Sequence, residues 1–312
     1  MANEIAEKSK TEVAERKKAG IASYLSSEAI RTNIESVVGK DIAQAFISDI
    51  VACVQNNTEL SACSNTSILS SALVAKSVNL PLTPQLGYAW LVPFDNKKQI
   101  NGHTEYVKEA SLQIGYKGYV QLATRSGYYK KIVATDVRKG EIKDYDPFND
   151  SYVFEPCEFD KRMAKDSKGN YIVPIIGYYA KFVMNTGLEK ELYMSAEDML
   201  EYAKKYSKAY RSDIKNHTSY SFWTTKFEDM ARKTMLRQLL GKWGLLTPDM
   251  QKAYTSDMAV MDENGNPIYL DNQPDEGEPV VNPFEEVSGE VIDSTATEIP
   301  NDIQKECDEV FK

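Results

Sequence analysis

The hydrophobic positions of residues 219–244 follow a helical period and form two apolar stripes. At about 100° per residue, one stripe consists of Trp223, Phe227, Met230, Ala231 and Thr234. The other stripe consists of Phe222, Leu236, Leu239, Leu240 and Trp243. Because a helix that is apolar on two sides packs on two sides, the pattern predicts one rigid helix inside the protein.

A narrow basic seam runs between these two stripes. It consists of Lys226, Lys233 and Arg237, spaced by seven and four residues. On a helix that is packed on both sides, few positions are open to water, so three cations on one seam are not expected there by chance. Their position favours a binding role. The alternative is a core helix whose long basic side chains extend along apolar surface to reach water. Both interpretations fit this segment.

Shorter patterns along the chain predict a mixture of helices and strands. Helices are expected at 40–56, 66–78, 118–126 and 195–207, from apolar positions at helical spacing and from capping residues. Strands are expected at 88–94, 111–116, 128–137, 151–159, 171–184 and 189–194, from aromatic and β-branched residues between turns. Loops are expected at 80–87, 95–105 and 211–218, where proline, glycine or polar residues accumulate.

The charge is distributed unevenly along the chain. The net charge of the 312 residues is −9, but residues 1–247 hold 34 Lys and Arg against 29 Asp and Glu, a net +5. Residues 248–312 hold 3 against 17, a net −14. Such asymmetry is common in nucleic-acid proteins. Because 262–302 is too polar to bury a core, the tail is expected to be largely disordered.

Several classes of protein are not expected from this sequence. The cysteines Cys53, Cys63, Cys157 and Cys307 have no CxxC spacing, so a reducing compartment is expected rather than a disulfide framework or zinc site. The charged N-terminus is not typical of a signal peptide, and no 18-residue apolar window could cross a membrane. No GxxxxGK[ST] loop occurs, so an ATP-driven motor is not expected.

Acidic residues at 136–150 offer the best enzymatic alternative, a metal-dependent nuclease. Glu141-Ile142-Lys143 resembles the second half of a nuclease metal motif, with Asp136 before it. Two-metal hydrolysis needs carboxylates that converge on adjacent ions. However, such motifs usually place the Glu-x-Lys on a strand, well after the first Asp, whereas here it stands beside Gly140 and a proline loop. A solvated charged loop is the competing interpretation.

Aromatic and basic residues interleave at 116–131. The cluster consists of Tyr116, Lys117, Tyr119, Arg125, Tyr128, Tyr129, Lys130 and Lys131. This mixture is typical of a nucleic-acid groove, because cations neutralise phosphates and aromatic faces stack on bases. The alternative is that the tyrosines pack in the core while the lysines face water. Residues 202–242 carry ten Lys and Arg against three acids, and this second basic cluster favours nucleic-acid binding.

A series of motifs resembles the RecT family of phage and prophage single-strand annealing recombinases. The motifs are 84–93 (PQLGYAWLVP), 113–118 (QIGYKG), 125–127 (RSG), 191–194 (ELYM), 203–207 (AKKYS), 222–223 (FW), 230–234 (MARKT) and 242–244 (KWG). Each motif alone is modest, but together and in family order they are specific. They cover roughly residues 30–247.

The resemblance implies an α+β fold in which a small antiparallel sheet and helices form a basic DNA groove. It implies a protein that binds single-stranded DNA and promotes its pairing with a complementary strand in homologous recombination, without ATP and without bond chemistry. It implies no required cofactor or metal site, with Mg²⁺ at most modulating DNA binding. The DNA-binding residues carried over by position are Tyr116, Lys117, Arg125, Lys130, Lys131, Lys226, Lys233 and Arg237.

The resemblance also implies an organisation and a set of partners. A flexible or helical arm (1–30) precedes a DNA-binding and oligomerisation core (31–247) and an acidic tail (248–312). Protomers would assemble into a ring or helical filament on single strands and on the annealed duplex intermediate. The tail would recruit a cognate exonuclease or the host single-strand-binding protein in the cytoplasm of a bacterial host. Its last apolar residues are either a docking helix or a chance pattern.

The chain departs from the family pattern at two acidic residues. Glu228 and Asp229 stand where family members are strongly basic, and they are expected to face away from the groove or to pair across protomers. Two other functions remain open. One is the metal-dependent DNA nuclease, and the other is a non-catalytic recombination scaffold that works through the acidic tail.

Overall fold

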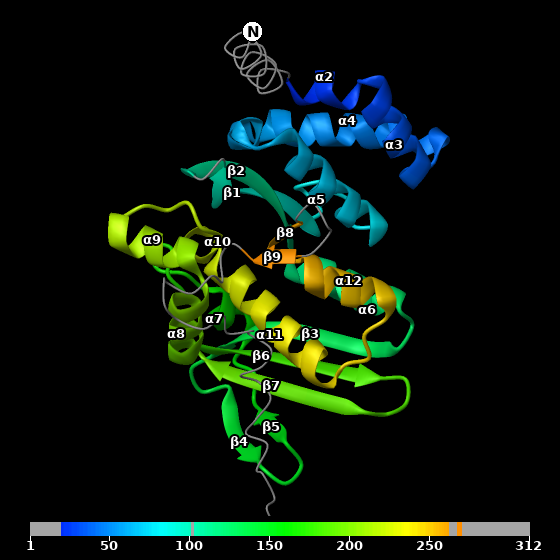
Figure 1. Ribbon diagram of the computed structural model, residues 1–312. Coiled ribbons are helices and arrows are strands. Elements are labelled where there is room, and N and C mark those ends of the chain that lie inside the picture. The colour runs from blue at the N-terminus through cyan, green and yellow to red at the C-terminus, as the bar shows by residue number, and fades with distance from the viewer. Residues whose placement is uncertain (1–19, 101–102, 262–266, 270–312) are drawn as a thin grey trace, which may run out of the picture.

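Helices and small antiparallel sheets make up the protein, which confirms the α+β class (Figure 1). The computed structural model describes residues 20–100, 103–261 and 267–269. The paired strands of these segments all run antiparallel. Within the same segments, no helix is long and apolar enough to cross a membrane.

An N-terminal helical layer covers one end of the molecule. It consists of α2 (Ile21–Leu25), α3 (Glu28–Val38), α4 (Lys40–Asn56), a 3₁₀ turn η1 (Thr58–Ala62) and α5 (Asn65–Ser77). The predicted apolar stripe of 40–56 is confirmed, because Phe46, Ile50 and Val54 of α4 are buried. Helix α5 begins at Asn65, because the Ser64 hydroxyl accepts the N–H of Ser67 and caps it.

A long hairpin of β1 (Ala89–Ile100) and β2 (His103–Ile114) lies against this layer. Residues 95–105 were expected to be a loop, which is wrong for 95–100 and 103–105. The strands continue because polar side chains pair across them: Glu109 accepts from the Asn96 amide at 2.7 Å and from Lys98 at 2.6 Å. Because these cross-strand pairs are polar, this part of the sequence lacks the alternation of apolar and polar residues that identifies a strand.

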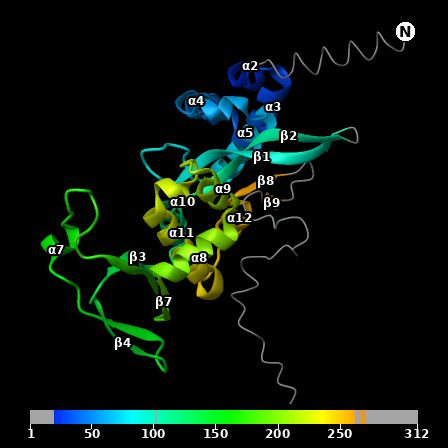
Figure 2. The ribbon, with the colours of Figure 1, turned by 90° about the vertical axis from the view of Figure 1, so that its left-hand side faces the viewer.

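A second sheet has the strand order β3 (Tyr129–Arg138), β6 (Ile175–Met184), β7 (Glu189–Ser195). Between β3 and β6 the chain forms an arm of β4 (Ile142–Asp146), β5 (Ser151–Phe154) and α7 (Phe159–Met163). Figure 2 shows this arm projecting from the body. The expected strands 151–159 and 171–184 are therefore too long, because 155–159 leads into α7 and 171–174 forms a loop.

The helices that pack on this sheet are α6 (Tyr116–Arg125), α8 (Ala196–Tyr206) and α11 (Phe227–Trp243). Next to them lie α9 (Lys208–Asn216), α10 (Phe222–Thr225) and α12 (Pro248–Ser256), which pack on these helices. Helix α11 packs against β3, β6, β7 and α6, and its Leu236, Leu239 and Leu240 are fully buried. The expected loop at 211–218 is wrong for 211–216, because this segment belongs to α9.

The helix expected at 219–244 is interrupted at Lys226. The backbone of Lys226 has φ −144° and ψ 50°, outside the helical region, so α10 ends before it and α11 begins after it. The Ser221 hydroxyl caps α10, and the Thr225 hydroxyl donates back to the Ser221 carbonyl. Such local hydroxyl bonds compete with helix propagation, so Lys226 does not share one straight seam with Lys233 and Arg237.

The packed body continues beyond residue 247, where the acidic tail was expected to begin. Met250 and Ala253 of α12 are fully buried, and two short strands follow, β8 (Ala259–Met261) and β9 (Pro267–Tyr269). Met258 has φ +65° and donates its N–H to the Leu112 carbonyl at 2.8 Å, which attaches this segment to β2. The remaining expectations for the tail and for residues 1–19 lie outside the described residues.

Candidate nucleic-acid interface

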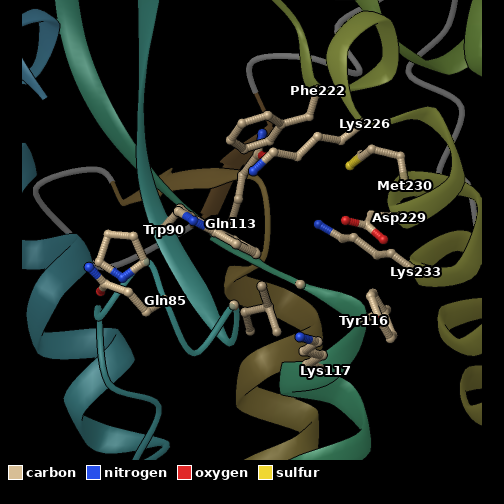
Figure 3. A pocket seen from close by; sticks show the side chains of 14 residues that line it. Gln85, Trp90, Gln113, Tyr116, Lys117, Phe222, Lys226, Asp229, Met230 and Lys233 are labelled. Carbon is tan, nitrogen blue, oxygen red and sulfur yellow. The ribbon is translucent and has the colours of Figure 1, made fainter. Parts of the chain in front are cut away.

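A cleft of about 190 Å³ lies between the β1–β2 hairpin and the α10–α11 segment (Figure 3). Three stretches of chain line it, and each belongs to a motif noted in the sequence. The lining residues are Pro84, Gln85, Gly87, Trp90, Gln113, Ile114, Gly115, Tyr116, Lys117, Phe222, Lys226, Asp229, Met230 and Lys233. The fold therefore brings Lys117 of the first basic cluster together with Lys226 and Lys233 of the second.

Two glycines fix the strand-side wall of the cleft. Gly87 has φ +69°, a left-handed conformation that glycine adopts without steric cost. A Cβ on Gly115 would lie 2.5 Å from Cζ3 of Trp90 and 2.7 Å from the Gly87 carbonyl oxygen, so no larger residue fits there. The Trp90 ring consequently packs directly on the backbone, which holds its plane in place.

An aromatic pair and a cation form the centre of the cleft. The ring centres of Trp90 and Phe222 are 5.9 Å apart at an interplanar angle of 59°. The Lys226 ammonium lies 5.5 Å from the Trp90 ring centre and 5.3 Å from that of Phe222 (Figure 3). These distances are within cation–π range. The break between α10 and α11 places Lys226 here.

Arg232 connects the cleft with the central sheet. Its guanidinium lies 5.9 Å from the ring centre of Tyr116 and donates to Asp229 at 3.2 Å and to Asp136 of β3 at 2.9 Å. Burial alone would raise the pKa of Asp136, but Arg232 and two further arginines outweigh it and lower that pKa. Arg232 therefore holds two cleft residues, Tyr116 and Asp229, against β3.

A buried ionic cluster adjoins the cleft through Lys233. Asp257 is 0% exposed; it pairs with Lys233 at 2.9 Å and with Arg237 at 2.6 Å, and it accepts from the Ile114 N–H and the Tyr119 hydroxyl. Burial alone would raise the pKa of Asp257, yet Lys233 and Arg237 keep it below its ordinary value. The carboxylate stays ionised and joins α11 to β2.

Asp213 of α9 positions Phe222. It accepts hydrogen bonds from the Ser221 N–H at 2.8 Å and from the Thr218 and Thr224 hydroxyls at 2.7 and 2.6 Å. Burial would raise the pKa of Asp213, but these bonds outweigh it and hold the pKa well below its usual range. One carboxylate thereby ties the start of α10 to α9.

The structure places four of the eight predicted DNA-binding residues in the cleft, namely Tyr116, Lys117, Lys226 and Lys233. Lys117 and Lys226 are exposed, whereas Lys233 is 3% exposed and bound to Asp257. Arg237 does not line the cleft. It contacts Asp257, the Tyr119 hydroxyl and the Tyr254 carbonyl beneath it.

The other three predicted residues lie elsewhere. Arg125 donates to the carbonyl oxygens of Val78 and Asn79 at 2.6 and 2.8 Å, so its guanidinium closes the end of the α5 segment. Lys130 and Lys131 are exposed at the irregular start of β3. Because Ile132 packs in the core beside α11, its neighbour Lys131 faces the opposite side of the sheet. Contact of these eight side chains with DNA stays a prediction.

Several residues of the site were not among the predicted DNA-binding residues. The available signal was that they lie within the noted motifs; these residues are Trp90, Gln113, Phe222 and Arg232. Asp229 was expected to face away from the groove or to pair across protomers. It lines the cleft beside Arg232, with which it pairs, so facing away is wrong, and pairing across protomers stays a prediction.

Arginines neutralise the carboxylates of the nuclease alternative. Glu141 is paired with Arg162, and Asp136 with Arg138, Arg162 and Arg232. Lys143 pairs with Glu155 on the arm instead of joining them. Within the described segments, no three His, Cys, Asp or Glu side chains gather as metal ligands. These residues therefore form a structural ionic cluster between β3, the arm and α11.

Comparison with known proteins places these features in a family. The family model described as "RecT family" matches residues 44–268. The "Uncharacterized protein YqaK" of Bacillus subtilis (strain 168) is 32% identical over 276 residues, which cover 88% of this chain and 84% of that protein. "Protein RecT" of Escherichia coli (strain K12) is 24% identical over 242 residues, covering 77% of this chain and 81% of that protein.

Proposed function

The chain belongs to the RecT family, a family of recombination and strand-annealing proteins, and on this premise we propose that it binds single-stranded DNA and anneals it to a complementary strand without ATP. The resemblance noted in the sequence is thereby confirmed at the level of the family. Single-strand binding and independence of ATP belong to the proposal.

The cleft is the observation that carries this proposal. Lys117 and Lys226 are exposed there, and within the described residues neither has an ion-pair partner, so both charges are available to phosphate. Trp90 and Phe222 add aromatic faces between them. Cations together with aromatic rings are the usual means of binding single strands without sequence preference.

The chemistry required of such a site is modest. The lysines would neutralise the phosphates of one strand and release its counterions. With its backbone held and its charge reduced, that strand would repel a complementary strand less, and base pairing would supply the specificity. No bond is made or broken in this scheme, and no nucleotide is consumed.

The proposal includes assembly and partners. A cleft of this size contacts only a short piece of a strand, so holding a long strand needs neighbouring protomers. We therefore propose a ring or helical filament on the single strand and on the annealed duplex. We propose that the acidic C-terminal segment contacts a cognate exonuclease or the host single-strand-binding protein in a bacterial cytoplasm. No cofactor is needed in this scheme, and Mg²⁺ would act only by screening DNA charge.

The two alternatives are less well supported. The arginine pairing of Asp136 and Glu141 leaves no free carboxylate pair for a nuclease metal site. A scaffold that works through its tail alone would not need exposed lysines beside aromatic rings. Failure to bind single-stranded DNA, together with retained binding of a protein partner, would favour the scaffold.

Salt-dependent binding of a labelled oligonucleotide tests the proposal. The logarithm of the binding constant should fall linearly with the logarithm of salt concentration, and each of Lys117→Ala and Lys226→Ala should reduce that slope by about 0.7 per lost phosphate contact. The control is Lys168→Ala, an exposed lysine on the arm. An unchanged slope in both cleft variants would mean that the cleft does not contact phosphate.

A further inference from the structure

We propose that the cleft holds one unstacked nucleobase of the bound strand, with its ring on Trp90 and Phe222 and its polar edge on the amide of Gln113. This inference rests on the proposed function and assigns the cleft a ligand beyond phosphate. It concerns a single nucleotide at each protomer, whose neighbours stay available for pairing.

Gln113 is the observation that points to a ligand. Its side chain is 6% exposed and lines the cleft beside Trp90 (Figure 3). Within the described residues, no hydrogen bond involves its amide, and the amide is not among the side-chain atoms that are sealed from solvent without a partner, so it opens into the cleft. An amide on a largely buried side chain that opens only into a cleft can be hydrogen-bonded only from that cleft. A ligand with both donors and acceptors would satisfy it.

The aromatic rings indicate that this ligand is flat. Trp90 and Phe222 both line the cleft and are only partly buried, at an interplanar angle of 59° that leaves ring surface available. Gly115 holds the Trp90 ring from behind, since any Cβ there would overlap it. A rigid ring backed by main chain is suited to stacking a base and is not needed to bind phosphate.

The size of the cleft limits how much of a strand it can hold. Pockets for drug-sized ligands have roughly 300–1,000 Å³, and this cleft has about 190 Å³. One planar ring system fits this space, whereas a stack of bases does not. Lys117 and Lys226 border the same space and would hold the phosphates on either side of that nucleotide.

The lining does not select one base. The Gln113 amide presents a carbonyl oxygen and an NH₂ group, so by turning over it can bond to the edge of any base. All four bases also have a π-face that can stack. The cleft would therefore accept any sequence, as an annealing protein requires, while keeping one nucleotide per protomer out of the stack.

The test compares two ligands of equal length and phosphate number, oligo(dT) and a fully abasic oligonucleotide. The wild-type protein should bind oligo(dT) roughly 5- to 150-fold more tightly, the range for one stacked base. Gln113→Leu and Trp90→Leu should lose most of this preference, and Trp90→Phe should retain most of it. Lys226→Ala should weaken the binding of both ligands by the same factor, because both ligands contain the phosphates that Lys226 contacts.

Controls separate this inference from the proposed function. Gln44→Leu, on the exposed face of α4, should keep the full preference, and a denaturant titration should show that Gln113→Leu is folded. If the wild-type protein binds neither ligand, the proposed function fails. If it binds both ligands equally, or if Gln113→Leu and Trp90→Leu keep the full preference, the base site is refuted while DNA binding stands.

Discussion

Removal of the Asp257 carboxylate should strongly destabilise the protein. Asp257 is fully buried between Lys233 and Arg237, at 2.9 and 2.6 Å, and it also accepts from a backbone N–H of β2 and from the Tyr119 hydroxyl. In Asp257→Ala, both cations lose this carboxylate inside the fold. A buried cation that loses a counter-charge is less stable than one in water.

The expected loss follows from the burial of this cluster. Breaking a buried ion pair by removal of one partner costs about 3–5 kcal/mol. Two cations lose one carboxylate here, but Lys233 borders the cleft and can be hydrated there, so we expect about 4 kcal/mol in total. For a domain of this size, each kcal/mol corresponds to about 2–4 °C in Tm, so the midpoint should fall by roughly 10 °C.

Urea unfolding followed by circular dichroism measures this loss. The matched control is Asp49→Ala, an exposed aspartate of α4 whose replacement should change the free energy of unfolding by less than about 0.5 kcal/mol. A loss below about 1 kcal/mol for Asp257→Ala would refute the reasoning, because it would mean that Lys233 and Arg237 find other partners or water.

Further predictions follow from neighbouring contacts. Arg237→Met should lower the unfolding midpoint and leave the salt dependence of DNA binding unchanged, in contrast to the exposed cleft lysines. The free energy of unfolding should be level at neutral pH and fall below about pH 4, as a pH series of urea titrations can show. The reason is that Asp213 and Asp257 have lowered pKa values in the fold, so acid protonates the unfolded chain first. Gly115→Ala should weaken single-strand binding by displacing Trp90, and Gly20→Ala, which has open space around it, is its control in the same binding titration. Deletion of 270–312, which has a net charge of −11, should leave oligonucleotide affinity unchanged or higher, and a large loss of affinity would contradict this.

Long periodic segments of the fold were predictable from the sequence. Helix α4 was recognised because its apolar residues face one core and repeat at the helical period, and strand β3 because β-branched and aromatic residues are concentrated in it. The outer half of the β1–β2 hairpin was missed because its pairing depends on polar contacts such as Asn96 with Glu109. The interruption at Lys226 was missed because hydroxyl bonds around Ser221 override the helical pattern.

The site was predictable in its chemistry but not in its geometry. The lysines of two sequence clusters do meet, yet only Lys117 and Lys226 are exposed there. The burial of Arg237 depends on Asp257, which composition alone assigns to an acidic tail. Two cations on a helix packed on both sides require a buried counter-charge, and this requirement was the signal that a carboxylate from elsewhere in the chain had to reach α11.

Annealing of complementary oligonucleotides tests the central claim most directly. Two strands labelled as a fluorescence energy-transfer pair are mixed with and without the protein, in the absence of any nucleotide and across a range of salt and Mg²⁺ concentrations. We predict faster pairing with the protein in some part of this range, and a smaller acceleration with the double variant Lys117→Ala, Lys226→Ala. Pairing that is no faster with the protein under any of these conditions would contradict the account.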